Sequence, residues 1–273
     1  MKTALLPGLL VLAAASAAPA HAGAVLAGHR AVYDLALGEA SDRSGITALT
    51  GRMVYEFNGS PCEGYTVTFR FVTKIETDET TRLTDQQSAT FEEGDGKGFR
   101  FVTKSYVNSA LDKELDGKAE LTAKETNVRI TKPAGDEIEL PVTQFPTQHL
   151  LELLQRAESG ETFYETTLFD GSDNADQVMT TTVIIGKKSE PKADDPELGP
   201  LGAASKQAYW PVTIAYFEPE SEKGQEVPIY RIAFKLHENG VTRDLTMDYG
   251  DFSMKGKLVN FDAFKPAGDC KAK

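Results

Sequence analysis

The chain has 273 residues, of which 40% are hydrophobic and 26% charged, and its formal net charge is −12. This composition is typical of a globular protein, and the length suffices for one large domain or two small ones. The acidic balance argues against a nucleic-acid-binding protein, because phosphate binding requires clustered Lys and Arg. It also disfavours adhesion to anionic lipid head groups by charge alone, and it fits a soluble secreted protein.

Residues 1–22 have the features of an export signal. Lys2 supplies the positive start, residues 4–20 are apolar and small, and Ala-His-Ala at 20–22 is typical of a cleavage site. Removal of 22 residues from 273 leaves 251, and loss of Lys2 changes the net charge from −12 to −13. No later apolar run approaches the roughly 18 residues of a transmembrane helix. We therefore expect a protein secreted across the inner membrane by a cleaved signal peptide, with a periplasmic location.

The chain has two cysteines, Cys62 and Cys270, which are far apart in the sequence. Neither lies at the cleavage site, so no lipid-modified cysteine is expected there. In an oxidising compartment the two can form one intramolecular disulfide, which would restrict the unfolded chain by roughly 4–5 kcal/mol. A redox pair would normally have its cysteines close together, as in Cys-x-x-Cys. The sequence therefore favours a structural disulfide between Cys62 and Cys270.

Alternation of apolar and polar residues predicts strands along most of the mature chain. The clearest case is Tyr65, Val67, Phe69 and Phe71, which alternate with polar residues in an antiparallel pattern. The hexapeptide Phe-Arg-Phe-Val-Thr-Lys occurs twice, and we interpret the copies as two strands of similar alternation. The expected strands are 31–37, 51–57, 65–75, 82–91, 98–107, 112–121, 127–132, 137–140, 162–169, 177–185, 207–217, 228–238, 241–249 and 256–264.

One segment, 148–159, has helical rather than strand periodicity. Thr147 is suited to cap its N-terminus, and Gly160 is suited to end it. Its apolar face should plug or cover an open sheet. That face consists of Leu150, Leu153, Leu154 and Ala157.

These elements predict an all-β fold: a large curled antiparallel sheet, as a β-spiral or open barrel-like arrangement, with one main helix packed against it. We expect residues 23–273 to form a single domain with two curled halves, about 23–145 and 146–273. The segment 187–206 is rich in Pro, Gly, Asp and Lys, and its composition predicts an exposed, mobile loop.

No residue pattern in the chain indicates a known catalytic or metal centre. His29, His149 and His237 have no metal-ligand spacing, and we interpret them as structural. Neither Gly-x-Ser-x-Gly nor Ser-x-x-Lys marks a nucleophile. Segment 170–176 resembles a calcium loop, but Ala175 and Thr181 replace the glycine and glutamate such a loop needs, which favours a polar turn. No catalytic residue, metal or cofactor is therefore expected.

The aromatic strand around Trp210 leaves one candidate site open. Trp210, Val212 and Ile214 share a face, and this face either packs in the core or lines a groove beside the helix. A concave sheet with an internal helix can hold an acyl chain or a lipid. The candidate cavity-lining residues are Leu150, Leu153, Leu154, Trp210, Val212 and Ile214.

Four ordered motifs carry a resemblance to a known family. They are His-Arg-Ala-Val-Tyr-Asp-Leu at 29–35, Gly-Ser-Pro-Cys-Glu-Gly at 59–64, Phe-Pro-Thr-Gln-His at 145–149 and Tyr-Trp-Pro-Val at 209–212, followed by Cys270. In this order they resemble the EipB family of cell-envelope integrity proteins from Gram-negative bacteria. The resemblance implies a periplasmic open β-spiral, a disulfide between Cys62 and Cys270, and no established catalytic site. It also implies a role under envelope stress and a partner that is a periplasmic tetratricopeptide-repeat protein.

Three functional hypotheses follow from the residues and the resemblance. The first is a non-enzymatic protein that maintains cell-envelope integrity under stress through protein contacts. The second is a carrier or sensor of a lipid-like hydrophobic ligand in a cavity beside the 148–159 helix. The third, a periplasmic hydrolase, would require a close cluster of histidine, nucleophile and acid.

Overall fold

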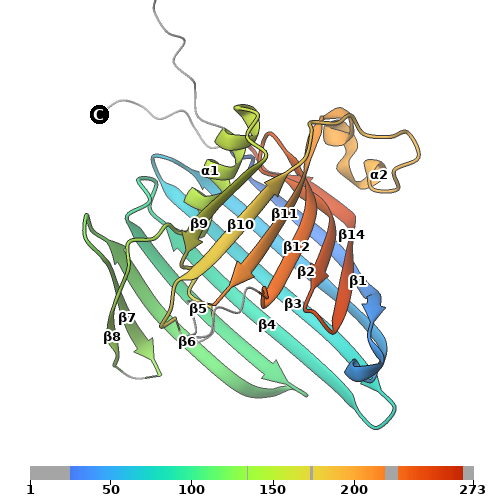
Figure 1. The fold of residues 1–273 in the computed structure, drawn as a ribbon, viewed down its shortest axis with the longest axis horizontal. Coiled ribbons are helices and arrows are strands. Elements are labelled where there is room, and N and C mark those ends of the chain that lie inside the picture. The colour runs from blue at the N-terminus through green and yellow to red at the C-terminus, as the bar shows by residue number, and fades with distance from the viewer. Residues whose placement is uncertain (1–24, 134, 173–174, 219–226, 267–273) are drawn as a thin grey trace, which may run out of the picture.

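The structure is a computed structural model that describes residues 25–133, 135–172, 175–218 and 227–266. Its described part is dominated by strands (Figure 1). The first eight strands are β1 (His29–Ala40), β2 (Ile46–Ser60), β3 (Gly64–Thr77), β4 (Thr81–Glu92), β5 (Gly98–Val107), β6 (Ala110–Leu121), β7 (Thr126–Lys132) and β8 (Glu137–Leu140). The later strands are β9 (Phe163–Leu168), β10 (Met179–Ile185), β11 (Tyr209–Phe217), β12 (Tyr230–His237), β13 (Thr242–Asp248) and β14 (Phe252–Ala263). A short 3-10 turn, η1 (Asp42–Ser44), joins β1 to β2.

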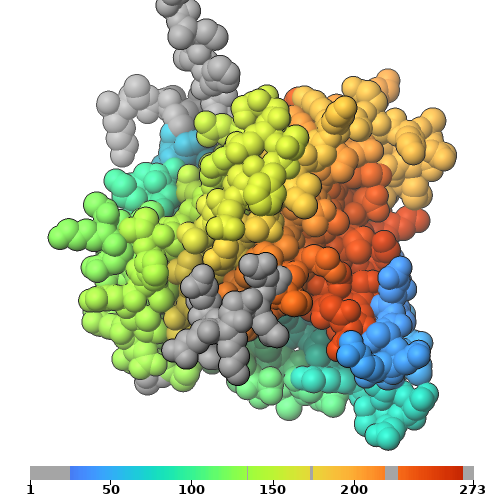
Figure 2. Space-filling model, viewed as in Figure 1, coloured from blue at the N-terminus to red at the C-terminus, as the bar shows by residue number. Residues whose placement is uncertain are grey.

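All these strands belong to one antiparallel sheet of 14 strands. Each half of the chain forms a meander, and the two meanders join where β1 pairs with β14. Strands β8 and β9 are the two edges, so within the described residues the sheet curls without closing. Figure 2 shows the C-terminal half, yellow to red, lying over the strands of the N-terminal half. The predicted fold class, a curled open antiparallel sheet with one main helix, is confirmed.

The main helix, α1 (Pro146–Glu158), begins two residues earlier than the sequence pattern predicts. Pro146 suits the first turn, because its missing N–H needs no partner there and its φ is already helical. Thr147 therefore lies inside the helix, and the cap position is Phe145, which has no side-chain cap bond. The expected Thr147 cap is thus wrong. Gly160, with φ of +82°, follows the end of the helix as expected.

The segment 187–206 is exposed at many positions, as its composition predicts, but it is docked on the sheet at others. It contains a short helix, α2 (Leu198–Leu201), and a 3-10 turn, η2 (Gly202–Lys206), and it pairs with β11 through Ser189 and Tyr209. Leu201 and Glu197 are each only 3% exposed. The segment docks because Leu201 reaches the main core and its acidic residues meet cations of the sheet.

Two apolar cores lie inside the curled sheet. The main core joins α1, through Leu153, Leu154 and Ala157, to side chains from both halves. A second core lies around Phe99 and Phe101, whose rings contact Phe145 and Phe169. The two cores together fix where α1 begins and which sheet face it covers.

Two features expected from the sequence lie outside the described residues. These are the signal peptide at 1–22 and Cys270, the predicted partner of Cys62. Cys62 lies in the turn after β2, and the described residues contain no free cysteine. The pairing of Cys62 with Cys270 stays a prediction. Within the described residues, no helix is long and apolar enough to cross a membrane.

Candidate ligand-binding cavity

A largely apolar cavity of about 370 Å³ lies between the two halves of the sheet and α1. The N-terminal half supplies one wall, and the C-terminal half supplies the opposite wall. Helix α1 covers a third side through Pro146, His149, Leu150 and Leu153. The first wall consists of Tyr33, Met53, Tyr55, Phe69, Phe71 and Gln86. The opposite wall includes Ile214, Tyr216, Tyr230, Ile232, Phe234, Leu245, Met247 and Tyr249.

Strand register explains why these side chains meet. Met53 pairs with Tyr33 on one side and Phe71 on the other, and Phe71 pairs in turn with Gln86. Directly paired residues in antiparallel strands project to the same face, so the four side chains form one row. A second row, Ile214, Ile232 and Met247, crosses β11, β12 and β13 in the same way.

An aromatic row follows the ends of β11, β12 and β13 along the opposite wall of the cavity. The ring centroids of Tyr216 and Tyr230 are 5.5 Å apart, those of Tyr230 and Tyr249 are 4.9 Å apart, and those of Tyr249 and Phe252 are 5.0 Å apart. Tyr249 is 40% exposed, whereas Ile214, deeper on the same wall, is 5% exposed.

The six candidate cavity-lining residues from the sequence fall into two groups. Leu150, Leu153 and Ile214 line the cavity. Leu154, Trp210 and Val212 do not line it and are buried in the main core. The indole of Trp210 is also covered by the Lys188 ammonium at 4.5 Å, so the docked 187–206 segment occupies that end of β11.

Aromatic side chains that the sequence analysis did not single out form a large part of the cavity wall. Tyr55, Phe69 and Phe71 belong to strands whose alternation is plain in the sequence, but alternation alone does not tell which face is concave. Tyr216 and Tyr230 lie on different strands and meet only through the β11–β12 register. Both residues are tyrosines, and this shared residue type is the one signal in the sequence that could have linked them.

A buried carboxylate from the sheet holds the start of α1. The Glu92 carboxylate, 1% exposed, accepts hydrogen bonds from the backbone N–H of Thr147 at 2.7 Å and of Gln148 at 3.0 Å. It supplies the acceptors that a local cap would otherwise provide, and its charge suits the positive end of the helix dipole. Burial raises the pKa of Glu92, and the hydrogen bonds from the helix offset part of that rise.

His149 fixes α1 against β10. Its Nε2 lies 3.1 Å from the hydroxyl of Thr181, and that hydroxyl donates to the carbonyl of Thr166. Because the hydroxyl proton is used, the histidine Nε2–H must be the donor to Thr181. Burial lowers the pKa of His149 to about 4, so the imidazole is neutral at physiological pH.

The C-terminal half of α1 is held by a second polar group. Glu152 accepts from Gln144 at 2.7 Å and from Arg156 at 2.8 Å, and Arg156 also donates to Glu161. The Arg156 guanidinium lies 4.3 Å above the ring of Tyr164 in β9. These contacts and Glu92 fix α1 from both ends, which makes the helix a well-positioned wall of the cavity.

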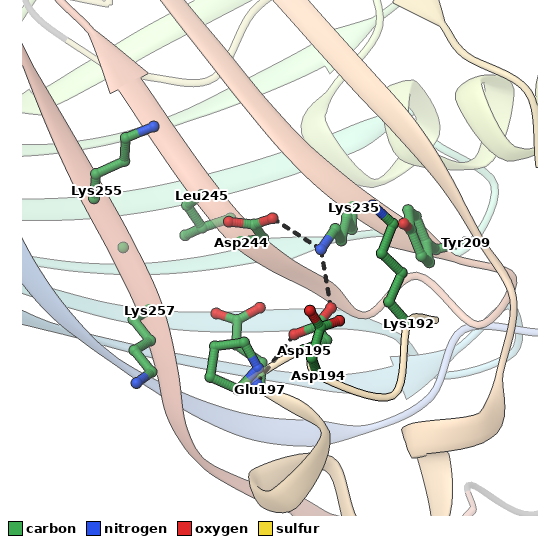
Figure 3. A pocket seen from close by; sticks show the side chains of 12 residues that line it. Lys192, Asp194, Asp195, Glu197, Tyr209, Lys235, Asp244, Leu245, Lys255 and Lys257 are labelled. Carbon is green, nitrogen blue, oxygen red and sulfur yellow. Dashed lines mark hydrogen bonds and ion pairs between the residues drawn. The ribbon is translucent and has the colours of Figure 1, made fainter. Parts of the chain in front are cut away.

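A separate pocket of about 480 Å³, lined by charged residues, lies where the 187–206 segment meets β12–β14 (Figure 3). Lys235 reaches both Asp195 and Asp244, each at 2.9 Å. Burial would raise the pKa of Asp195, but hydrogen bonds from Lys235 and Arg243 outweigh it and lower that pKa to about 2. Glu197 accepts from the backbone N–H of Leu258 at 2.6 Å. The carboxylates of this pocket thus attach the segment to the sheet.

The cluster of charged side chains around this pocket extends into the protein interior to Arg243, whose side chain is fully buried. Its guanidinium donates to Asp195 at 2.6 Å and to the Nε2 of His237 at 3.1 Å. Nε2 accepts, so the proton of His237 is on Nδ1, which lies 3.1 Å from the carbonyl of Ala208. Burial, followed by the nearby Arg243 charge, lowers the pKa of His237 to about 4.

The described residues contain no group of three or more His, Cys, Asp or Glu side chains arranged to hold a metal ion. Residues 173–174 of the calcium-loop-like segment lie outside the described part. The geometry therefore defines an antiparallel β protein with one open curled sheet and a helix-covered apolar cavity.

Comparisons with known proteins place the chain within one family. A family model described as EipB-like matches residues 20–265. The protein named cell envelope integrity protein EipB from Brucella abortus (strain 2308) is 54% identical over 251 residues, which cover 92% of this chain and 89% of the relative. A crystal structure described as a beta-barrel-like protein of a domain of unknown function, DUF1849, from Brucella abortus is 55% identical. It has a TM-score of 0.85, and the match covers 89% of this chain and 100% of that one. The chain belongs to the EipB-like family.

Proposed function

We propose that this protein maintains the integrity of the cell envelope from the periplasm, without catalysing a reaction. The observation that carries this proposal is the 54% identity, over 92% of the chain, to a protein named for cell envelope integrity. The export signal at 1–22 supplies the location in this proposal. The protein would act under envelope stress and through contacts with other molecules.

The positions of the histidines support a non-enzymatic role. His29 contacts the carbonyl of Ala27 at 2.8 Å, His149 donates to Thr181, and His237 accepts from Arg243. All three side chains are buried, at 5% exposure or less. A general base must reach the proton it removes from a substrate, and buried imidazoles in these roles are poorly placed to do so.

Contact with another protein is the first route by which this role would be exerted. The family resemblance implies a periplasmic tetratricopeptide-repeat protein as the partner. In-cell crosslinking, followed by identification of the captured chains, tests this directly. A tetratricopeptide-repeat protein crosslinked to the wild type, and absent when residues 1–22 are deleted, is the expected result.

Genetic complementation tests the envelope role itself. A strain lacking this protein should lose viability in detergent or in cell-wall antibiotics, and the full-length chain should restore it. A variant without residues 1–22 should accumulate but fail to restore viability. Full rescue by the unexported variant would contradict a periplasmic role.

A second candidate function, a carrier or sensor of a lipid-like ligand, has its own support. The cavity between the sheet halves and α1 is lined mainly by aromatic and aliphatic side chains, which is typical of small-molecule sites. Co-purification from envelope extract, analysed for lipids, tests this candidate. A stoichiometric lipid supports it, and a protein that remains lipid-free after incubation with envelope lipids contradicts it.

A further inference from the structure

We propose that the cavity between the sheet halves and α1 binds a single-chain amphiphile whose polar head carries no charge, such as a monoacylglycerol or a long-chain alcohol. This inference rests on the second candidate function and names the ligand class of that site. It follows from the size of the cavity, the lack of Asp, Glu, Lys and Arg among the described residues of its wall, and the position of its hydroxyl groups.

The volume limits the ligand to one chain. Ligand pockets generally span about 300–1,000 Å³, and a cavity of about 370 Å³ lies at the lower end of that range. The three sides that bound it are fixed by strand pairing and by contacts at both ends of α1. A lipid with two or three acyl chains would leave most of its apolar surface in water.

The wall offers no partner for a charged head group. Among the described residues that line the cavity, none is Asp, Glu, Lys or Arg. His149 is its one basic side chain, and the Nε2 of that ring already donates to Thr181. An ion moved from water into such a site loses its hydration without gaining a counter-charge, which is strongly unfavourable.

Carboxylates behind the wall make an anionic head still less favourable. Burial raises the pKa of Tyr33, Tyr55 and Tyr216, and nearby negative charge adds a smaller rise; at Tyr33 the hydrogen bond to the carbonyl of Thr242 offsets part of it. The charge comes from Glu197 at Tyr33, from Glu92 at Tyr55 and from Asp170 at Tyr216. A fatty-acid carboxylate would meet the same repulsion on both walls of the cavity.

Hydroxyl and amide groups supply the polar contacts that an uncharged head needs. No hydrogen bond joins the hydroxyl of Tyr55 or Tyr216 to another described residue. Tyr55 and Gln86 lie on the first wall, and Tyr216 lies on the opposite wall within the tyrosine row. Both tyrosines are partly exposed, so their phenol groups are accessible to an ester or alcohol of a ligand and can donate to it or accept from it.

Calorimetric titration of the full mature protein with three probes of equal chain length tests this proposal. The probes are 1-monomyristoylglycerol, myristate and tetradecyltrimethylammonium, each below its critical micelle concentration. We expect one equivalent of the glycerol ester to bind at least about 10-fold more tightly than either ion. Tighter binding of myristate would overturn the uncharged-head assignment. Tighter binding of the ammonium probe would also overturn it, because tyrosine rings can hold quaternary ammonium groups.

Two sets of variants tie binding to the cavity. Ile232→Trp places a large side chain into the cavity and should abolish binding, whereas Arg231→Trp changes the neighbouring exposed residue of β12 and should not. Tyr55→Phe and Tyr216→Phe should each weaken ester binding by about 2- to 10-fold, the usual range for one hydrogen bond. Tyr106→Phe, outside the cavity, is their control.

The results distinguish a failure of the carrier or sensor function from a failure of the proposed ligand class. If none of the three probes binds and the protein also stays lipid-free with envelope lipids, the carrier or sensor function fails. If an ion or a two-chain phospholipid binds best and Ile232→Trp abolishes that binding, the site stands and the ligand class proposed here is wrong. Thermal unfolding curves that match the wild type confirm that the variants are folded.

Discussion

At the scale of single residues, the most consequential contact joins positions 55 apart in the chain. Glu92 of β4 accepts from the backbone of Thr147 at the start of α1. Helix-start rules consider only neighbouring residues, and Thr147 satisfied them locally. The helix instead begins at Pro146, nearer the N-terminus than the pattern predicts, and Glu92 of the sheet supplies the hydrogen-bond acceptor. Sequence patterns therefore predicted that a helix would form here but not how it is anchored.

Substitution of Glu92 tests this anchor. In Glu92→Gln, an amide nitrogen replaces one of the two acceptor oxygens and faces a backbone N–H, either of Thr147 or of Gln148. We expect the free energy of unfolding to fall by about 1–3 kcal/mol. Urea denaturation measures this, with Glu93→Gln, at an exposed neighbour, as the control. Equal stability of the two variants would show that the buried carboxylate does not anchor α1.

The buried histidines predict a loss of stability in mild acid. Burial lowers the pKa of both His149 and His237 from 6.5 to about 4. Between these values the unfolded chain binds protons that the folded chain does not, so stability falls as pH falls from 6.5 towards 4. From pH 6.5 to 5 each histidine should contribute a loss of about 1.5 kcal/mol. Glu92 and Glu197, whose pKa values are raised by burial, act in the opposite direction.

A single variant isolates one histidine from these opposing groups. His149→Gln retains a side-chain N–H donor for Thr181 but does not titrate. The difference in unfolding free energy between wild type and variant should therefore shift in favour of the variant by about 1.5 kcal/mol between pH 6.5 and pH 5. Urea denaturation at the two pH values measures it. A difference that does not change with pH would mean that His149 titrates normally in the folded state.

At the scale of elements, alternation predicted every strand of the described sheet, with differences only at the ends. It could not predict which face of each strand would be concave. The two copies of Phe-Arg-Phe-Val-Thr-Lys illustrate this. Phe69 and Phe71 from one copy line the cavity, whereas Phe99 and Phe101 from the other are buried in the second core. Identical local patterns thus have different roles, because β3 faces the C-terminal half while Phe99 and Phe101 of β5 pack against Phe145 and Phe169.

For the 187–206 segment, sequence composition predicted the exposed positions but not the contacts that dock it on the sheet. Its Pro, Gly and charged residues indicate solvent, but Asp195 pairs with the fully buried Arg243 and with Lys235. Arg243 lies 48 positions away, so no local pattern could connect the two.

Removal of the Asp195 carboxylate should release this segment. Asp195→Ala leaves the buried Arg243 with its hydrogen bond to His237 and with one longer carboxylate contact among the described residues, to Glu197 at 3.4 Å. Breaking a buried ion pair typically costs about 3–5 kcal/mol. We expect a loss of stability of that order and faster proteolysis within 187–206, while the exposed neighbour Asp194→Ala changes neither. Protease resistance equal to wild type would show that other contacts hold the segment.

At the scale of the whole molecule, the pairing of β1 with β14 joins the two meanders into one sheet. It connects residues more than 200 positions apart, and no pattern within either strand specifies it. The two curled halves were predicted from the central helix, but their junction and the cavity between them depend on this long-range register. Apolar walls from both halves are therefore brought together by topology rather than by local sequence.

The predicted disulfide would also connect parts of the molecule that are far apart in the sequence. If Cys62 and Cys270 are paired, Cys62→Ser and Cys270→Ser should lower the free energy of unfolding equally, by roughly 4–5 kcal/mol or less. Denaturation of both variants under oxidising conditions measures this, and a reducing agent should bring the wild type to the same value. A harmless substitution at either position would exclude a stabilising disulfide between them.

Native mass spectrometry of the protein purified without detergent from the cells that produce it tests the central claim most directly. The account predicts that one equivalent of an uncharged, single-chain lipid accompanies the wild type and Arg231→Trp and is absent from Ile232→Trp. A wild type without bound lipid, or a lipid retained equally by Ile232→Trp, would contradict the assignment of the cavity as a ligand site.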